Sequence, residues 1–359
     1  MIFGFSREAE SPAWIERGAS LALLAAVLFG LSAPFAKGLL RDAEPQLLAG
    51  LLYLGSGAGL AAAWLFRRRR RGEASLSRHD LPWLASAIAA GGILGPLLLL
   101  LGLERTPASS ASLLLNLEGV FTALFAWFLF QENFDRRIAL GMLAIVAGGA
   151  VISWDGRVAW GGMTGPLLIA AACLCWAIDN NLTQRVSASD PVQIAMLKGI
   201  TAGAVNTGLA VWLGAAWPGT GRVGAALLLG FLSYGLSLVL FVLALRHLGT
   251  ARTGAYFSVA PFVGAAVAIL GFGERPTALF VVGAALMLLG VWLHLTERHL
   301  HEHTHHALEH EHAHVHDEHH RHAHRPEDPP GEPHTHPHRH EPLTHTHRHY
   351  PDVHHRHPH

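Results

Sequence analysis

Ten apolar runs fill most of the chain between residues 18 and 296. A helix rises 1.5 Å per residue, so a run of about 20 apolar residues crosses roughly 30 Å of hydrocarbon. So little chain separates the runs that no soluble domain fits between them. We therefore predict an all-α, polytopic membrane protein with ten transmembrane helices, at residues 18–37, 46–66, 82–102, 107–130, 137–154, 163–183, 191–213, 223–245, 250–272 and 277–296.

Positive charges in the short connections indicate how these helices are oriented. Fourteen Lys and Arg residues, including the run Arg67–Arg71, fall on the side that holds the N-terminus, and six fall on the other side. Since cytoplasmic loops carry the excess of Lys and Arg, both termini are expected in the cytoplasm, with the protein in the inner membrane of a bacterium. The arginine run is expected to touch anionic lipid rather than nucleic acid.

A sequence repeat relates the two halves of the membrane part. An odd number of spans in each copy places the second copy upside down, as in secondary transporters with a substrate site near the midplane between the halves. We expect a cytoplasmic segment at 1–17, inverted five-helix repeats at 18–154 and 155–298, and a tail at 299–359. The early helices match at a shift of 146 residues, with AAVLFG from Ala25 on AACLCW from Ala171. At a shift of 142, Leu101, Leu103, Ala123, Ala126, Phe130, Glu132, Gly141 and Gly148 fall on Leu243, Leu245, Ala265, Ala268, Phe272, Glu274, Gly283 and Gly290.

Both repeats contain a Glu nine positions before a Gly, first as Glu132 and Gly141 and then as Glu274 and Gly283. With the five-plus-five layout, this motif resembles the EamA family of the drug/metabolite transporter superfamily, over residues 18–296. The resemblance implies a transporter of amino acids, drugs or other small metabolites.

The fourth predicted helix departs from that family at its centre. The family often has a proline midway through helices four and nine; this chain has Pro261 in helix nine but Gly119 in helix four, and we expect kinks at both. Beside Gly119 stands Glu118, the one charged residue in the run 107–130. A midplane carboxylate is costly unless it faces protein or water, so Glu118 is expected to point into the bundle, either protonated or paired with a cation. It is a candidate for proton coupling or substrate binding; the alternative is a protonated side chain that only bonds a neighbouring helix.

A second polar group lies toward one end of helices six and seven. Asp179 and Asn180 lie at a depth similar to that of Lys198 on the adjacent, oppositely directed helix. An ion pair between Lys198 and Asp179 would neutralise both charges, and these three residues are also substrate-site candidates. Asn116 and Tyr256 are weaker candidates, as are Asn206 and Tyr234, for which helix-to-helix hydrogen bonding is the alternative.

The tail from residue 299 holds 24 of the 27 histidines, mostly in H-x-H and HH pairs. Its second half is rich in proline and poor in apolar residues, so we expect disorder. Such dense imidazoles are expected to bind Zn, Ni, Co or Cu, whether or not the binding matters in the cell. The candidate ligands are His301, His303, His305, His306, His314, His316, His319 and His320.

Two functions fit these features. The first is a secondary transporter that exports a small organic metabolite by alternating access, with proton coupling through Glu118 as an option. The alternative is a divalent metal (Ni, Co or Zn) permease, or a metal-responsive membrane protein, that uses the tail; the scarcity of His and Cys in the spans argues against metal passing through the core. No G-x-x-x-x-G-K-[ST] motif is present, so we do not expect a transport ATPase. The transporter interpretation also predicts that the protein is not an enzyme and requires no cofactor. The expected partners are a small-molecule substrate, the lipid bilayer, divalent metal ions and, as one option, a second copy in a homodimer.

Overall fold

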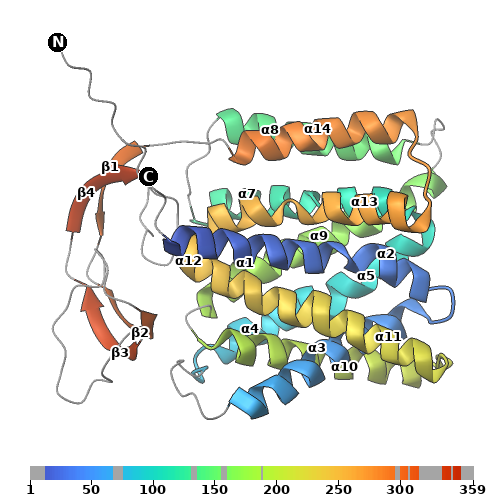
Figure 1. Cartoon of the computed structure of the whole chain (residues 1–359), viewed down its shortest axis with the longest axis horizontal. Helices are drawn as coiled ribbons and strands as arrows, with labels where there is room; N and C mark the ends of the chain where they lie inside the picture. Colours follow the sequence, from blue (N-terminus) through green and yellow to red (C-terminus); the bar gives the residue numbers. More distant parts are fainter. Residues whose placement is uncertain are drawn as a thin grey trace.

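The computed structural model describes residues 13–67, 76–130, 136–154, 160–186, 189–295, 300–305, 308–314, 334–340 and 343–348. Its membrane part is a bundle of helices (Figure 1). The first repeat consists of α1 (Ala13–Gly30), α2 (Ser32–Leu39), α3 (Pro45–Arg67), α4 (Leu81–Ala87), the π-helical segment η1 (Ile88–Leu94), α5 (Gly95–Arg105), α6 (Ala108–Leu114), α7 (Leu117–Phe130) and α8 (Arg136–Ser153). The second consists of α9 (Trp160–Val186), α10 (Pro191–Trp212), α11 (Thr220–Gly230), the π-helical segment η2 (Phe231–Leu236), α12 (Ser237–Phe257), α13 (Ala260–Phe272) and α14 (Ala278–Leu295).

The predicted membrane spans are present as helices. Among the described residues, 8 helical segments are long and apolar enough to cross a bilayer, and two shorter apolar helices, Ala260–Phe272 and Ala278–Leu293, follow them. These ten segments correspond to the ten apolar runs, and several runs contain more than one helix because the helices are interrupted. The membrane part is therefore all-α, as predicted.

The helix α12 contains the end of one span and the start of the next. The rings of Phe241 and Phe257 lie 4.9 Å apart, centroid to centroid. In a straight helix, 16 residues would separate them by about 24 Å. The chain therefore reverses direction between these two residues, which agrees with the predicted boundary between the runs 223–245 and 250–272.

Two glycine contacts between α8 and α14 show how the repeats are related. A methyl group on Gly148 would lie 2.7 Å from the carbonyl oxygen of Gly283, and one on Gly290 would lie 2.6 Å from that of Gly141. The shift of 142 exchanges these two contacts, as expected for a twofold-related interface. The two helices are antiparallel and lie side by side along one edge of the bundle (Figure 1). This arrangement confirms the inverted repeat.

Interruptions occur at matching places in the two repeats. The π-helical segments η1 and η2 begin 143 residues apart, at Ile88 and Phe231. The fourth span breaks at Leu115 and Asn116, between α6 and α7, and the ninth breaks at Ser258 and Val259, between α12 and α13. Each of these breaks places the start of a new helix inside the membrane part. Secondary transporters build substrate sites from such discontinuous helices.

The hydrophobic core lies where the two repeats meet. Its fully buried members include Leu47 and Leu48 of α3, Leu99 of α5, Ile169 of α9 and Ile194 of α10. Bulky apolar side chains also cover the outside of the bundle; Leu270, for example, is 85% exposed. An apolar exterior is what a lipid-facing surface requires.

The described parts of the tail are extended rather than irregular. The strand β1 (Leu300–His305) pairs antiparallel with β4 (Leu343–Arg348), and β2 (Leu308–His314) pairs with β3 (His334–His340). The sequence predicts disorder here, but an alternation of period two, as in H-x-H, also suits a strand. The remaining residues of the tail lie outside the described part of the chain.

Candidate functional site

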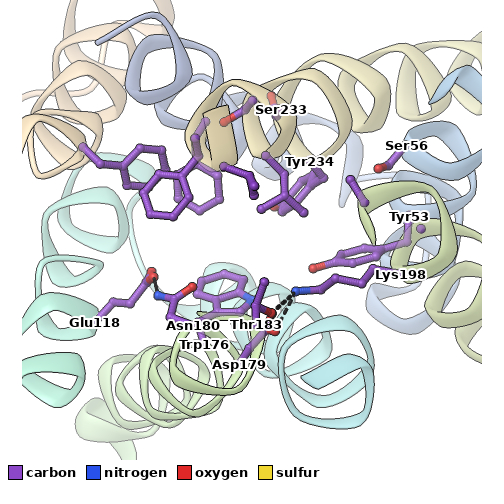
Figure 2. A pocket seen from close by; sticks show the side chains of 18 residues that line it. Tyr53, Ser56, Glu118, Trp176, Asp179, Asn180, Thr183, Lys198, Ser233 and Tyr234 are labelled. Carbon is purple, nitrogen blue, oxygen red and sulfur yellow. Dashed lines mark hydrogen bonds and ion pairs between the residues drawn. The ribbon is translucent and has the colours of Figure 1, made fainter. Parts of the chain in front are cut away.

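A cavity of about 100 Å³ lies inside the bundle, with walls from both repeats (Figure 2). Its lining includes Phe29 of α1, Tyr53 of α3 and Glu118 of α7 from the first repeat, and Lys198 of α10 and Tyr234 of η2 from the second. One buried water needs roughly 10–15 Å³ of such space, so the cavity has room for several waters or a small solute. Walls from both repeats are what is expected of the substrate site in an inverted-repeat transporter.

The cavity lies toward one end of the bundle. On α9 it is lined from Trp176 to Thr183, close to the C-terminal end of the helix, and on α10 from Ala195 to Gly199, close to the N-terminal end. These helix ends are the ones that the positive charges predict to be cytoplasmic.

Glu118 lies in the first turn of α7 and lines the cavity, as predicted. The break before α7 creates a helix start, whose partial positive charge favours a carboxylate. The Oε1 atom of Glu118 accepts a hydrogen bond of 2.7 Å from the Nδ2 atom of Asn180, across the boundary between the repeats. Within the described residues, no ion pair to Glu118 is present. The carboxylate is half-buried and retains acceptor capacity on the cavity side.

Lys198 and Asp179 form the buried ion pair that their depths predict. The ammonium group of Lys198 donates to Oδ1 and Oδ2 of Asp179 at 2.6 and 2.7 Å and to Oγ1 of Thr183 at 3.2 Å. The Thr183 hydroxyl donates in turn to Oδ1 of Asp179 at 2.9 Å. The side chains of Lys198 and Asp179 are only 4% and 9% exposed. In Figure 2 the Glu118–Asn180 contact and this pair lie on the same side of the cavity, facing Tyr234 across open space.

The π-helical segment η1 supplies a backbone acceptor that fixes one wall. The carbonyl oxygen of Gly91 accepts two hydrogen bonds of 2.9 Å, one from the hydroxyl of Tyr53 and one from the Nε1–H of Trp176. A π-helical turn disrupts the usual ladder of backbone hydrogen bonds, and side chains can use the freed carbonyl groups. Two aromatic side chains of the lining are thereby held in place by α3, α9 and η1.

An aromatic cluster forms the remainder of the lining. The ring of Phe29 lies 6.0 Å from that of Trp176 and 5.9 Å from that of Tyr234, both edge to face, and 5.3 Å from that of Phe257. The ring of Phe241 extends the cluster on the far side of Phe257. Aromatic faces carry partial negative charge, so this wall favours apolar and cationic groups over anions.

Two predicted site residues and the two predicted kinks differ in part from expectation. Asn116 is buried outside the lining, where its Nδ2 donates to the Leu113 carbonyl oxygen at 3.0 Å. Tyr256 packs beside the buried pair of Ala22 and Ala244 rather than in the cavity.

Asn206 is fully buried and donates from Nδ2 to the Gly92 carbonyl oxygen at 3.3 Å, a helix-to-helix bond of the kind anticipated. The interruptions of helices four and nine precede Gly119 and Pro261 by a few residues, so both residues lie in the first turn of the new helix. Proline is well tolerated there because its missing N–H needs no helical partner.

Several residues of the cavity lining could not be identified as site residues from the sequence. Ser56, Thr183, Ser233 and Ser237 are small polar residues of a kind found throughout the spans. Phe29 and Phe257 resemble any apolar residue of a membrane helix. These residues can be distinguished from lipid-facing residues only when it is known which face of each helix points into the bundle. The sequence repeat does not give this information.

A second polar cluster lies at the other end of the bundle, beside a pocket lined by Lys37 and Glu274 among others. The carboxylate of Glu274, which follows α13, accepts hydrogen bonds of 2.8 Å from the backbone N–H groups of Ala108 and Ser109 at the start of α6. Lys37 of α2 donates to the carbonyl oxygens of Leu103 and Thr106 at the end of α5. Glu274 thus joins the second repeat to the first at the end away from the cavity.

Metal ligands are not gathered in the membrane part. Among the described residues, no group of three or more His, Cys, Asp or Glu side chains could hold a metal ion. Of the predicted tail ligands, His301, His303, His305 and His314 lie on the strands β1 and β2. His306, His316, His319 and His320 lie outside the described residues.

Comparison with known proteins agrees with this architecture. A relative from Methanothermobacter thermautotrophicus, named an uncharacterized transporter, is 27% identical over 296 residues, which cover 76% of this chain and 84% of the relative. A probable terminal-alkyne amino-acid exporter from Streptantibioticus cattleyicolor is 28% identical, over 60% of this chain and 73% of its own. A probable 4-amino-4-deoxy-L-arabinose-phosphoundecaprenol flippase subunit from Pseudomonas aeruginosa is 45% identical over 75 residues, covering 21% of this chain and 63% of that subunit.

A known crystal structure shares the fold, with a TM-score of 0.60 at 18% sequence identity, over 77% of this chain and 94% of the other. Residues 16–154 and 163–296 each match the EamA-like transporter family, so one match falls on each of the two five-helix halves. The protein is an integral membrane protein, and it belongs to the EamA-like transporter family.

Proposed function

We propose that the protein is a secondary transporter that carries a small organic solute through the central cavity by alternating access. The observation that carries this proposal is the position of Glu118, at the start of a broken helix and in a cavity walled by both repeats. Rocking of two inverted repeats about such a cavity exposes it to one side of the membrane and then to the other.

The link that Glu274 makes between the repeats, at the end away from the cavity, supports this mechanism. To open the cavity toward that end, the second repeat must release the two backbone N–H groups that Glu274 holds. Hydrogen bonds to a charged group contribute about 1.5–3 kcal/mol each, so they would stabilise the closed arrangement substantially. We propose that they are broken and re-formed once in each transport cycle.

The names of two relatives favour an amine as cargo and outward transport. One is named as a probable exporter of an amino acid, and the other as a subunit of a flippase for a lipid-linked amino sugar. Both of these cargoes carry an amino group. An ammonium group and a proton would compete for Glu118, so binding of one would release the other. This competition would couple export of the solute to entry of a proton.

The metal-related alternative depends on the tail alone. We propose that its 24 histidines bind divalent metal ions on the side of the membrane where the tail lies. Truncation after residue 298 should abolish high-capacity binding of Ni or Zn to the purified protein while leaving solute transport intact. Metal transport that depends on the tail would favour the permease instead.

Solute exchange in proteoliposomes tests the proposal. Vesicles loaded with amino acids or organic amines should exchange them with labelled solute outside, and a pH gradient should drive accumulation. Glu118→Gln keeps the size and hydrogen-bonding ability of the side chain, and it should abolish the pH-driven accumulation. Glu44→Gln, at an exposed carboxylate outside the cavity, is the matched control and should transport normally. Unchanged accumulation in Glu118→Gln would reduce this carboxylate to a packing role.

A further inference from the structure

Lys198 and Glu118 differ in the hydrogen-bonding capacity that each leaves free for a ligand. Lys198 is the one Lys or Arg among the described residues that line the cavity. A lysine ammonium group has three N–H donors and no acceptor. Its three acceptors here are the two Asp179 oxygens and the Thr183 hydroxyl, at 2.6, 2.7 and 3.2 Å. No donor of Lys198 therefore remains for a carboxylate on the solute.

Glu118 is in the opposite situation. Its carboxylate has two oxygens with about four acceptor positions, and the side chain of Asn180 occupies one of them at 2.7 Å. The described residues provide no cation that neutralises it. With Lys198 and Asp179 cancelling each other, the ionised cavity has a net charge of about −1, located at Glu118. The vacant acceptor positions suit an ammonium group.

The walls next to Glu118 suit an apolar body attached to that ammonium group. Phe29, Trp176, Tyr234 and Phe257 surround the space with rings whose centroids lie 5.3–6.0 Å from that of Phe29. A cation within about 6 Å of an aromatic face gains further attraction. The cavity volume of about 100 Å³ is below the roughly 300–1,000 Å³ of pockets for drug-sized ligands, which favours a small molecule.

We propose that the cavity selects small aromatic or aliphatic monoamines that carry no free carboxylate, and that it discriminates against the zwitterionic amino acids. This inference rests on the proposed transport function and narrows its substrate class. The ammonium group would bind Glu118 and the apolar body would pack among the rings. A carboxylate on the same molecule would be desolvated without a cationic partner among the described lining residues, and burial of an unpaired charge is costly.

A matched set of ligands tests this selectivity on the intact chain. Phenethylamine, phenylalanine and 2-phenylethanol share a phenyl ring. Phenylalanine adds a carboxylate, and 2-phenylethanol has a neutral hydroxyl in place of the ammonium group. Binding to the purified full-length protein in nanodiscs would be followed by the fluorescence of tryptophan, since Trp176 lines the cavity. We expect phenethylamine to bind at least about tenfold more tightly than either of the other two, because phenylalanine adds a carboxylate and 2-phenylethanol lacks the ammonium group.

The variant Glu118→Gln separates binding by charge from binding by shape. It should weaken the binding of phenethylamine by about tenfold or more and leave the binding of 2-phenylethanol unchanged. A merely structural role of Glu118 would not produce this difference. The inference is overturned if phenylalanine binds as tightly as phenethylamine, or if none of the three ligands binds. Both results are measured on the native protein, so they do not depend on whether the variant folds. If amino acids bind and are exchanged in proteoliposomes, the transport function stands and only the proposed substrate class fails. Absence of exchange for every solute would instead contradict the transport function.

Discussion

The buried ion pair offers a quantitative test of how the cavity is built. At a shift of 146 residues, Asp179 and Lys198 fall on Ala33 and Leu52 of the first repeat, so the same fold accommodates apolar residues at these positions. We compare Lys198→Leu alone with the double variant Lys198→Leu/Asp179→Ala. The double variant gives the second repeat the residues that the first already has.

The structure indicates the size of each effect. Lys198→Leu leaves the Asp179 carboxylate, 9% exposed, with Thr183 as its remaining described partner. Removal of one member of a buried pair typically costs about 3–5 kcal/mol. Replacing both by apolar residues is often neutral, and Thr183 can then bond a carbonyl oxygen one turn earlier in α9. We expect the double variant to lie within about 1.5 kcal/mol of the native protein.

Unfolding by a denaturing detergent, followed by tryptophan fluorescence, gives the free energies of unfolding of all three proteins. The double variant should be clearly more stable than Lys198→Leu, although it carries one more substitution. If the double variant is no more stable than Lys198→Leu, or if Lys198→Leu alone unfolds like the native protein, the description of this pair as mutually neutralising is wrong.

Four further substitutions test other contacts. Gly91→Ala places a methyl group against the carboxylate of Asp179 and should lower the free energy of unfolding by about 1–3 kcal/mol. The control Gly119→Ala has open space around it and should change the free energy of unfolding by less than about 1 kcal/mol. Equal effects of the two variants would contradict the close contact between Gly91 and Asp179. Glu274→Gln weakens the charged cap on α6. It should increase labelling of a cysteine introduced at Ser56, in the cavity lining, by a membrane-impermeant thiol reagent added on the side where Glu274 lies. Unaltered labelling would rule out a gating role. Gly148→Leu should separate α8 from α14 and destabilise the protein by about 1–3 kcal/mol in the same unfolding assay, and a native-like value would refute the close helix contact.

The architecture could be predicted from the sequence because its strongest signals are spread over whole helices. Apolar run length gives the spans, and the repeat gives their inverted relation, which the contacts of Gly148 with Gly283 confirm. Glu118 stands out because an isolated charge in a membrane span needs a partner, and Lys198 and Asp179 stand out because their depths match.

The identity of the wall residues could not be predicted in the same way. In a membrane helix, apolar residues face both lipid and protein, so Phe29 in the cavity and Trp212, 80% exposed, look alike in the sequence. Tyr234 and Tyr256 were equally plausible, and only Tyr234 lines the cavity. Their difference depends on the π-helical segment η2, which changes the face that the helix presents and leaves no clear pattern in the residues.

Accessibility of the cavity from the two sides of the membrane tests alternating access most directly. Ser56, buried in the lining, would be changed to Cys in a chain whose Cys173 and Cys175 are replaced by Ser. We predict that a membrane-impermeant thiol reagent labels this residue from either side of the membrane, and that transported solute protects it. Labelling from one side only, or labelling that no solute affects, would contradict a cavity that opens alternately between the two repeats.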